Sequence, residues 1–257
     1  MIAAQGIVVT TGRRRLVDVV SIAVRPGQVT AVLGPNGSGK STLLKVLAGE
    51  IAPSGGSVSL DGRPLAAWRR ADLARRRAVL PQHGAIDFPL TAGEVVALGR
   101  SPWSGRPESL DDADAVAHAR ERLDLGPLWD QLYPTLSGGE RQRVQLGRAL
   151  AQLWVRRPAA PRYLLLDEPT SALDIAHQLE VLALARELAG KGIGVLAVLH
   201  DLNQALTAAD GFVLLARGQI VEAGAIADGP TAAALQAVYH VPVEFVRRAD
   251  GRRAALV

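Results

Sequence analysis

Two short stretches of the sequence carry residue types suited to binding phosphate. The first is GPNGSGKS at residues 34–41, and the second is YLLLDE at residues 163–168. Glycines let the first stretch turn tightly, so that consecutive backbone N–H groups converge on phosphate oxygens. This stretch follows an apolar strand pattern at 28–34 and precedes a helical pattern at 40–49, whose N-terminus adds a positive dipole end. The pattern therefore predicts a phosphate-binding loop, the P-loop.

The polar side chains of both stretches have chemical roles in such a site. Lys40 can reach the β- and γ-phosphates, and the Ser41 hydroxyl is a hard oxygen ligand that suits Mg²⁺. Asp167 and Glu168 end an apolar strand, at the edge where open α/β sheets bind ligands. Asp167 can hold a Mg²⁺ water, and Glu168 can polarise a water that attacks the γ-phosphate. The predicted nucleotide-binding residues are Gly34, Pro35, Asn36, Gly37, Ser38, Gly39, Lys40, Ser41 and Thr42.

Three residues at other strand ends carry a weaker signal. The amide of Gln82 in VLPQH can contact Mg²⁺ or a water, whereas the adjacent His83 is interpreted as incidental. His200 follows the apolar run LAVL and is a candidate γ-phosphate contact. A single histidine at a strand end is more often structural, so His200 depends on the P-loop for its interpretation.

The stretch LSGGERQRVQLGRAL at residues 136–150 combines a helix start with poor helix formers. Ser137 and Glu140 have the spacing of a capping box. Gly138 and Gly139 would lie in the first turn, where each costs up to about 1 kcal/mol relative to alanine. The buried face of this helix is predicted to hold Leu146, Leu150 and Leu153. Capping alone does not explain two glycines, so a further role at this helix start is expected.

The elements that must position these residues alternate between apolar strands and amphipathic helices. This alternation predicts an α/β fold with a mainly parallel sheet, helices on both faces and an antiparallel β portion. Strands are predicted at 161–169 and 192–200, a helix at 175–192 and a hairpin at 211–224 that turns at 217–219. One stripe of that helix should be buried and holds Val181, Leu184, Ala185 and Leu188.

The segment at about 88–158 differs in composition from the rest of the chain, because it is poor in strand-like runs and rich in Ala, Leu, Arg and Asp. It is assigned to a helical insertion. Within it, SPWSGRPESLDD at 101–112 is predicted to be a loop, before a helix from about Leu110.

Composition excludes several classes of protein. The chain has 257 residues, 48% of them hydrophobic and 21% charged, which indicates a soluble globular protein. No apolar run is long enough to span a membrane, and no signal peptide is recognisable. The absence of cysteine excludes disulfides and is compatible with a cytosolic location. A net charge of +4 permits nucleic-acid binding, but aromatic residues are scarce, so solvated arginines are the favoured explanation.

Over essentially the whole chain, the sequence resembles the ATP-binding subunit of an ABC transporter. Six motifs stand in the family's order: Walker A at 34–41, the Q-loop Gln82, the signature LSGGE at 136–140, Walker B at 163–168, the D-loop SALD at 171–174 and the switch His200. The resemblance implies one P-loop NTPase domain over 1–257. Its parts would be a RecA-like core at about 1–87 and 159–240, a helical subdomain at about 88–158 and an extension at 241–257.

The resemblance also implies an ATP-dependent head-to-tail dimer, in which each ATP lies between one subunit's Walker A and the other's signature. The roles carried over are Lys40 and Ser41 for phosphate and Mg²⁺, Gln82 and Asp167 for the Mg²⁺ sphere, Glu168 as catalytic base, His200 as γ-phosphate sensor, Ser137, Gly138 and Gly139 for the γ-phosphate in trans, and Asp174 in the D-loop. Lys40, Glu168 and His200 are the expected catalytic residues.

The sequence departs from the family at the residue that stacks on adenine. An aromatic side chain is usual about 25 residues before the P-loop, but Thr10 or Thr11 occupies this position here. Arg13 or Arg14 could stack on the base through its guanidinium plane instead. Selectivity for adenine is therefore expected to be loose.

Two segments, residues 78–103 and 200–224, resemble importers of iron chelates, haem and cobalamin. Residues 82–103, together with 153–178, look closest to the haem importer ATPases. A ferric-siderophore or cobalamin importer is the alternative. The resemblance implies ATP and Mg²⁺, a second copy of the chain, and two transmembrane permease subunits that contact residues 82–106. It also implies, indirectly, a periplasmic substrate-binding protein, and a peripheral position on the cytoplasmic face of the bacterial inner membrane.

Three other functions fit less well, and no nucleic-acid partner is expected. Soluble ABC ATPases of ribosomes or DNA usually carry two cassettes or a long coiled coil, and neither is seen here. An exporter would be expected to show a fused membrane domain. A P-loop kinase would leave the signature LSGGE unexplained.

Overall fold

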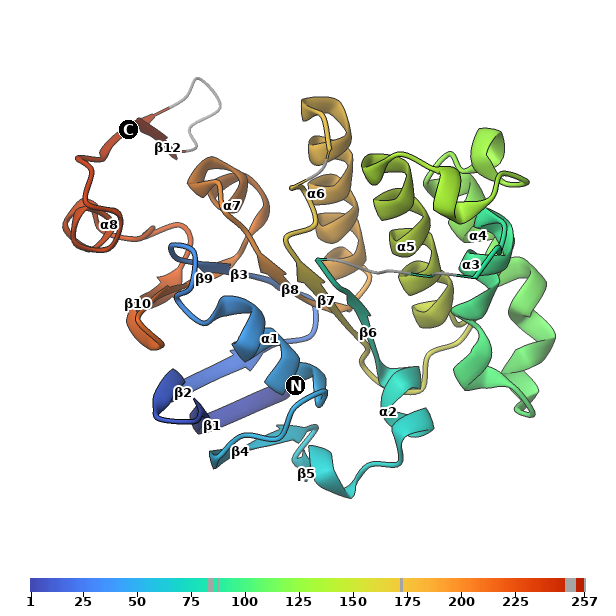
Figure 1. Ribbon diagram of the computed structural model, residues 1–257, viewed down its shortest axis with the longest axis horizontal. Coiled ribbons are helices and arrows are strands. Elements are labelled where there is room, and N and C mark those ends of the chain that lie inside the picture. Colours follow the sequence, from blue (N-terminus) through green and yellow to red (C-terminus); the bar gives the residue numbers. More distant parts are fainter. Residues whose placement is uncertain (83–85, 87, 172, 248–252, 257) are drawn as a thin grey trace.

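A six-stranded sheet runs through the middle of the computed structural model, which describes residues 1–82, 86, 88–171, 173–247 and 253–256 (Figure 1). Its strands are β3 (Val29–Leu33), β6 (Arg77–Leu80), β7 (Tyr163–Asp167), β8 (Gly194–Val198), β9 (Gly211–Ala216) and β10 (Gln219–Ala225). They lie in the order β10-β9-β3-β8-β7-β6, and only the β9–β10 pair is antiparallel. The predicted mainly parallel sheet is confirmed.

A second, antiparallel sheet packs beneath the first, with one helix between them (Figure 1). Its strands are β1 (Ile2–Thr11), β2 (Arg14–Val24), β4 (Gly55–Leu60) and β5 (Arg63–Pro64), in the order β2-β1-β4-β5. The helix is α1 (Lys40–Ala48), and Gly49 ends it in the left-handed conformation, with φ at 69°. Side chains of β1, β2, β4 and α1 form one core with the lower face of the parallel sheet. This core holds the P-loop helix between two rigid layers.

Helices cover the other face of the parallel sheet. They include α5 (Gly138–Leu153), α6 (Ile175–Gly190) and α7 (Leu202–Ala208). Strand β7 shows why its sequence is continuously apolar: Leu164 and Leu166 join the core on the helical side, whereas Tyr163 and Leu165 join the core on the α1 side. The buried stripes predicted for α5 and α6 are confirmed.

The segment assigned to a helical insertion contains α3 (Ala92–Leu98), α4 (Asp112–Arg122) and α5. The predicted loop at 101–112 includes two short 3-10 turns, at Ser101–Trp103 and Pro107–Asp111. Arg100, which is 4% exposed, ties this segment together: its Nε donates to Asp112 at 2.7 Å, and its guanidinium donates to the carbonyls of Ala151 and Trp154, each at 2.8 Å. A further helix, α2 (Arg70–Arg76), leads into β6.

The C-terminal part adds α8 (Ala232–Tyr239) and a small hairpin of β11 (Glu244–Arg247) and β12 (Arg253–Leu256). The predicted β9–β10 hairpin is confirmed, and its turn uses left-handed conformations at Arg217 and Gly218, with φ at 50° and 81°. Among the described residues, no helix combines the length and apolar character needed to cross a membrane. Some residues of the segments named above fall outside the described residues: 83–85 (which include His83) and 87, Ala172 of SALD, and 248–252 and 257 in the C-terminal segment.

Candidate active site

The P-loop requires glycine at two positions for steric reasons. Gly34 and Gly39 have φ values of 143° and 105°, a region that L side chains rarely adopt. A Cβ atom at Gly34 would lie 2.1 Å from the carbonyl oxygen of Leu215, and one at Gly39 would lie 2.5 Å from that of Leu16. The loop therefore packs directly against the backbones of β2 and β9.

Lys40 and Ser38 are buried inside this loop with unused bonding capacity. The Nζ atom of Lys40 donates to the carbonyls of Gly34 at 2.7 Å and Pro35 at 3.0 Å. Burial lowers the pKa of Lys40, and the Glu168 and Asp167 carboxylates partly offset that effect. The Ser38 hydroxyl is buried and has no hydrogen-bond partner among the described residues. A buried hydroxyl without a partner fits a loop that is completed by a phosphate oxygen.

The predicted Mg²⁺ ligands on the P-loop and β7 are in contact. The Ser41 Oγ donates to Asp167 Oδ1 at 3.0 Å, and Asp167 is 4% exposed. Burial is the main cause of the raised pKa of Asp167, although the Ser41 bond and two nearby lysines act in the opposite direction. A hydroxyl next to a buried carboxylate is a donor set of hard oxygens, which fits a divalent cation.

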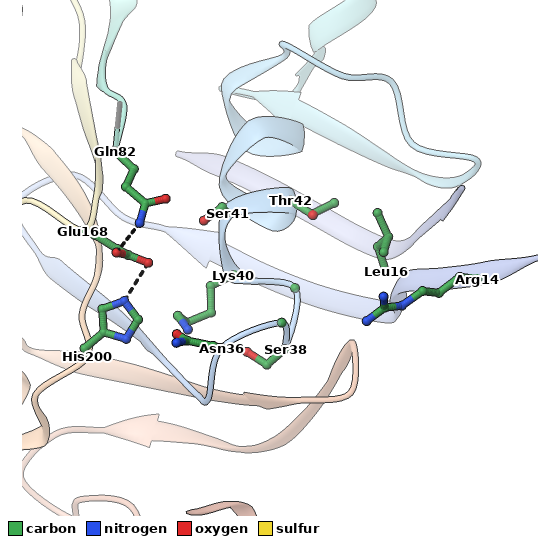
Figure 2. Close-up of a pocket in the computed structure, with 12 residues that line it drawn as sticks. Arg14, Leu16, Asn36, Ser38, Lys40, Ser41, Thr42, Gln82, Glu168 and His200 are labelled. Carbon is green, nitrogen blue, oxygen red and sulfur yellow. Dashed lines mark hydrogen bonds and ion pairs between the residues drawn. The ribbon is translucent and has the colours of Figure 1, made fainter. Parts of the chain in front are cut away.

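Glu168 lies between two polar side chains from neighbouring strand ends. Its carboxylate accepts a hydrogen bond from Gln82 Nε2 at 2.5 Å, and its other oxygen lies 2.6 Å from His200 Nε2 (Figure 2). Gln82 follows β6 and His200 follows β8, so adjacent parallel strands bring the three residues together. The Glu168 backbone has a φ of 51°, a strained conformation of the kind that persists where surrounding structure enforces it.

Two further residues hold the Glu168 backbone. Gln142 was not predicted from the sequence, and Ser171 was named only as the first residue of the D-loop motif SALD. The carbonyl oxygen of Glu168 accepts bonds from Gln142 Nε2 at 3.2 Å and Ser171 Oγ at 3.1 Å. Gln142 lies on α5, the helix that the LSGGE stretch begins, and so joins that helix to β7. No motif predicted it, because its contact depends on packing between elements distant in sequence.

Gln82, Glu168 and His200 line a cleft of about 650 Å³ together with the P-loop, whereas Gly34, Pro35 and Asp167 are not among its lining residues. The polar groups of Gln82, Glu168 and His200 stand on one side of the P-loop, and Arg14 and Leu16 stand on the other (Figure 2). Of the two arginines considered for adenine, only Arg14 is among the lining residues, and neither Thr10 nor Thr11 is. The remaining lining residues are Asn36, Gly37, Ser38, Gly39, Lys40, Ser41 and Thr42.

The signature residues do not line this cleft. The predicted capping box exists: Glu140 N donates to Ser137 Oγ at 3.3 Å, and Ser137 N donates to Glu140 Oε2 at 2.8 Å. Ser137 and Gly138 are exposed. Asp174 also lies outside the cleft, where its side chain caps α6 by accepting from His177 N at 2.9 Å. The P-loop cleft and the exposed Ser137 and Gly138 are thus separate parts of the chain's surface.

Comparison with known proteins yields one family and close relatives. The family model described as "ABC transporter" matches residues 17–171. The "Hemin import ATP-binding protein HmuV" of Gloeobacter violaceus is 50% identical over 224 residues, which cover 87% of this chain and 82% of the relative. The protein of the same name from Shewanella denitrificans is 47% identical over 250 residues, which cover 97% of each chain.

Solved structures share the fold. An inward-facing ABC transporter described as of the metal-chelate type aligns with a TM-score of 0.79 at 27% identity, over 99% of this chain and 96% of that one. A dimeric bacterial ABC transporter cassette aligns with a TM-score of 0.76 at 25% identity, over 88% and 99%.

Proposed function

The chain belongs to the ABC transporter family, as an ATP-binding subunit with ATPase activity, and we propose that it powers a bacterial haem importer. The single observation that carries the ATPase assignment is the cleft in which the P-loop meets Glu168, Gln82 and His200. The haem assignment is supported by the curated relatives, which are named for hemin import and match most of the chain.

In the proposed hydrolysis, Glu168 is the base. A water oxygen attacks the γ-phosphorus of ATP, the bond to the β–γ bridging oxygen breaks, and the Glu168 carboxylate takes the proton of the water. Lys40 and the N–H groups of the P-loop offset the phosphate charge. His200 Nε2 lies 2.6 Å from Glu168, so its imidazole can orient the base. In the proposed role of γ-phosphate sensor, the ring would turn its N–H from Glu168 to the phosphate. Gln82 donates to one carboxylate oxygen of Glu168 at 2.5 Å, which leaves further lone pairs of the carboxylate for the attacking water.

Mg²⁺ is proposed to bind at Ser41, Asp167 and Gln82. The Ser41 and Asp167 oxygens are already adjacent at 3.0 Å, and the amide oxygen of Gln82 lies on the side of Ser41 (Figure 2). When bound, Mg²⁺ would neutralise charge on the β- and γ-phosphates.

A second copy of the chain is proposed to complete each site. The signature residues Ser137, Gly138 and Gly139 are absent from the cleft of their own chain, whereas the helix start that they form is accessible. Glycines at a helix N-terminus let bare N–H groups approach a phosphate closely. In a head-to-tail dimer, these groups and Asp174 would meet the nucleotide held by the other subunit's P-loop. Relatives of this fold include a dimeric cassette.

The remaining partners follow from the importer assignment. We propose two transmembrane permease subunits that contact residues 82–106, a periplasmic substrate-binding protein that acts through them, and a peripheral position at the cytoplasmic face of the inner membrane. The division into a core at about 1–87 and 159–240, a helical subdomain at about 88–158 and an extension at 241–257 is part of the same proposal.

Replacing Glu168 by Gln tests the ATPase assignment. The variant Glu168→Gln should still bind ATP, because the P-loop is intact, but hydrolyse it at least about tenfold more slowly, since a general base contributes 10²–10⁴-fold. Phosphate release and fluorescent-nucleotide binding are measured side by side. Glu187→Gln, which removes a carboxylate of α6 that does not line the cleft, should keep normal turnover. Normal turnover in Glu168→Gln would remove this residue from the role of base.

The cargo is tested separately, with the membrane proteins that copurify with the chain. The complex is reconstituted in vesicles and assayed for ATP-dependent uptake of haem, a ferric siderophore and cobalamin. Haem uptake that is lost in Glu168→Gln supports the proposal. Uptake of the siderophore or cobalamin without haem would identify the alternative importer.

A further inference from the structure

A second cavity, of about 340 Å³, lies between α6, α7 and the C-terminal hairpin. Guanidinium groups from three elements line it: Arg186 from α6, Arg247 from β11 and Arg253 from β12. Leu206 and Ile226 add apolar surface beside them. None of these residues lines the cleft at the P-loop.

Two of the arginines are paired directly across the hairpin. Arg247 and Arg253 are register partners in the β11–β12 ladder, so their side chains project from the same face. Phe245 and Ala255 are also register partners, two residues further along, and both pack against the main core. The face that carries the two arginines therefore turns toward the body of the protein. Like charges directly opposite one another destabilise a strand pair.

Within the described part of the chain, the cations of this cavity exceed the acidic groups that face them. Arg186 pairs with Asp210 at 2.5 Å, and that carboxylate also accepts from Val29 N at 2.7 Å. Arg253 donates to the carbonyl oxygen of Asp228 at 2.6 Å and lies over the Phe245 ring, with its Cζ atom 3.9 Å from the ring centroid. The Arg247 side chain has neither a hydrogen bond nor an ion pair with the described residues. Among the residues that the structure describes, these three guanidinium groups thus have a single carboxylate partner, Asp210.

We propose that this cavity binds a phosphate group carrying two negative charges, as free phosphate or a phosphate monoester or as a lipid headgroup. The planar guanidinium fork matches phosphate oxygens in bidentate geometry, and an anion between Arg247 and Arg253 replaces their repulsion by two charge-assisted bonds. The apolar surface of Leu206 and Ile226 suits the carbon part of a monoester or a lipid. This site is independent of the ATP site.

Binding would fasten the hairpin to the helices beneath it. The hairpin is already held by Asn203 of α7, whose side chain donates to Ala255 O at 3.1 Å and accepts from Ala255 N at 2.8 Å. An anion bridging Arg186 with Arg247 and Arg253 adds a link between α6 and both hairpin strands. The backbone amides of β11 and β12 should then open less often and exchange with solvent more slowly.

Hydrogen exchange of the hairpin amides, followed by mass spectrometry, tests the proposal on the full chain. The probes are inorganic phosphate and glycerol 3-phosphate, at an ionic strength held constant with chloride, and vesicles of phosphatidylcholine with or without phosphatidic acid. Exchange in residues 244–247 and 253–256 should slow with phosphate, with the monoester or with the phosphatidic acid vesicles. Slowing by free phosphates identifies a small-molecule source, and slowing by the acidic vesicles alone identifies a lipid. No slowing with any probe overturns the proposal.

Variants locate the anion. Arg247→Gln should bind the effective probe at least about tenfold more weakly, which is the usual loss when a charge-assisted hydrogen bond is removed. Arg247→Lys keeps the charge without the fork and should fall between Arg247→Gln and the parent chain. The matched control is Arg25→Gln, at an exposed arginine that does not line the cavity. Lys40→Ala weakens phosphate binding at the P-loop and should leave hairpin slowing intact. Slowing that persists in Arg247→Gln, or disappears in Lys40→Ala, overturns the proposal.

Discussion

Replacing Asp167 by Asn should stabilise the protein in the absence of nucleotide and remove its response to magnesium and ATP. Asp167 is 4% exposed, and its raised pKa means that burial, together with the nearby Glu168 carboxylate, outweighs the Ser41 bond and the charges of Lys45 and Lys40. The ionised carboxylate is therefore a net cost to the fold near neutral pH. Asparagine keeps an oxygen that can accept from Ser41 at the observed 3.0 Å, so the charge is lost while this hydrogen bond is kept.

The magnitude follows from that balance. An incompletely compensated buried carboxylate costs about 1–2 kcal/mol of the free energy of unfolding. For a chain of this size, each kcal/mol moves the melting temperature by about 2–4 °C, so Asp167→Asn should melt about 2–8 °C higher. With magnesium and ATP at about 100 times the dissociation constant, the parent chain should gain about 2.7 kcal/mol, and the variant should gain much less. The difference between the melting temperatures of Asp167→Asn and the parent chain should therefore shrink or change sign when the ligand is added.

Thermal unfolding by calorimetry in EDTA, with and without added magnesium and ATP, provides the assay. The pKa of Asp167 is higher in the folded chain than in the unfolded chain, so the penalty is complete above the folded pKa and disappears as the pH falls below the unfolded value. The advantage of Asp167→Asn should thus be largest near pH 7.5 and shrink on acidification. Asp18→Asn should instead lower the melting temperature, because hydrogen bonds from Gln219 and Arg15 lower the pKa of Asp18. A lower melting temperature for Asp167→Asn in EDTA would refute the reasoning.

Two more predictions concern the loop and the base. Gly39→Ala should lose most ATP binding, because its Cβ would lie 2.5 Å from Leu16 O at a φ of 105°. The control Gly62→Ala, at an exposed turn with φ 79° and open space, should bind ATP normally. Equal affinities of the two variants in a fluorescent-nucleotide titration would contradict the steric argument. GTP should compete measurably with ATP for binding to the parent chain. Arg14→Tyr should increase the preference for ATP over GTP. Arg14→Lys keeps the charge but loses the planar guanidinium group, so it should weaken the binding of both nucleotides. Strict ATP selectivity in the parent chain would count against a role for Arg14 at the base.

The parts predictable from sequence were those encoded locally. The P-loop, the apolar strand β7 and the capping box at Ser137 each lie within one short segment, where glycine placement, hydrophobic runs and side-chain spacing determine the structure. The positions of Gln82, Glu168 and His200 after apolar strands also indicated a shared site, because the carboxyl ends of parallel strands lie at one edge of the sheet.

The parts that sequence did not predict depend on contacts between distant segments. Gln142 bonds the Glu168 carbonyl across two elements. The sequence named Arg13 and Arg14 equally, and only the packing of β2 against the P-loop shows that Arg14 is the one that lines the cleft. The N-terminal sheet is another case: an antiparallel portion was expected, but its strands were not located. Its two long strands pair through several register shifts, which disturb a simple alternation of buried and exposed residues.

The bond from Gln142 to the Glu168 carbonyl gives the proposed dimer a route for cooperativity. In that dimer, α5 of one subunit begins at the nucleotide held by the other, while Gln142 on the same helix holds the base of its own subunit at 3.2 Å. Occupancy of one site would therefore bias the geometry of the opposite base, and the two ATP molecules would be hydrolysed as a coupled pair rather than independently. Gln142→Ala should lower the Hill coefficient of ATP turnover toward one, and an unchanged coefficient would show that the coupling runs elsewhere. The side-chain amide of Gln142 would then determine how strongly hydrolysis at one site depends on the other site.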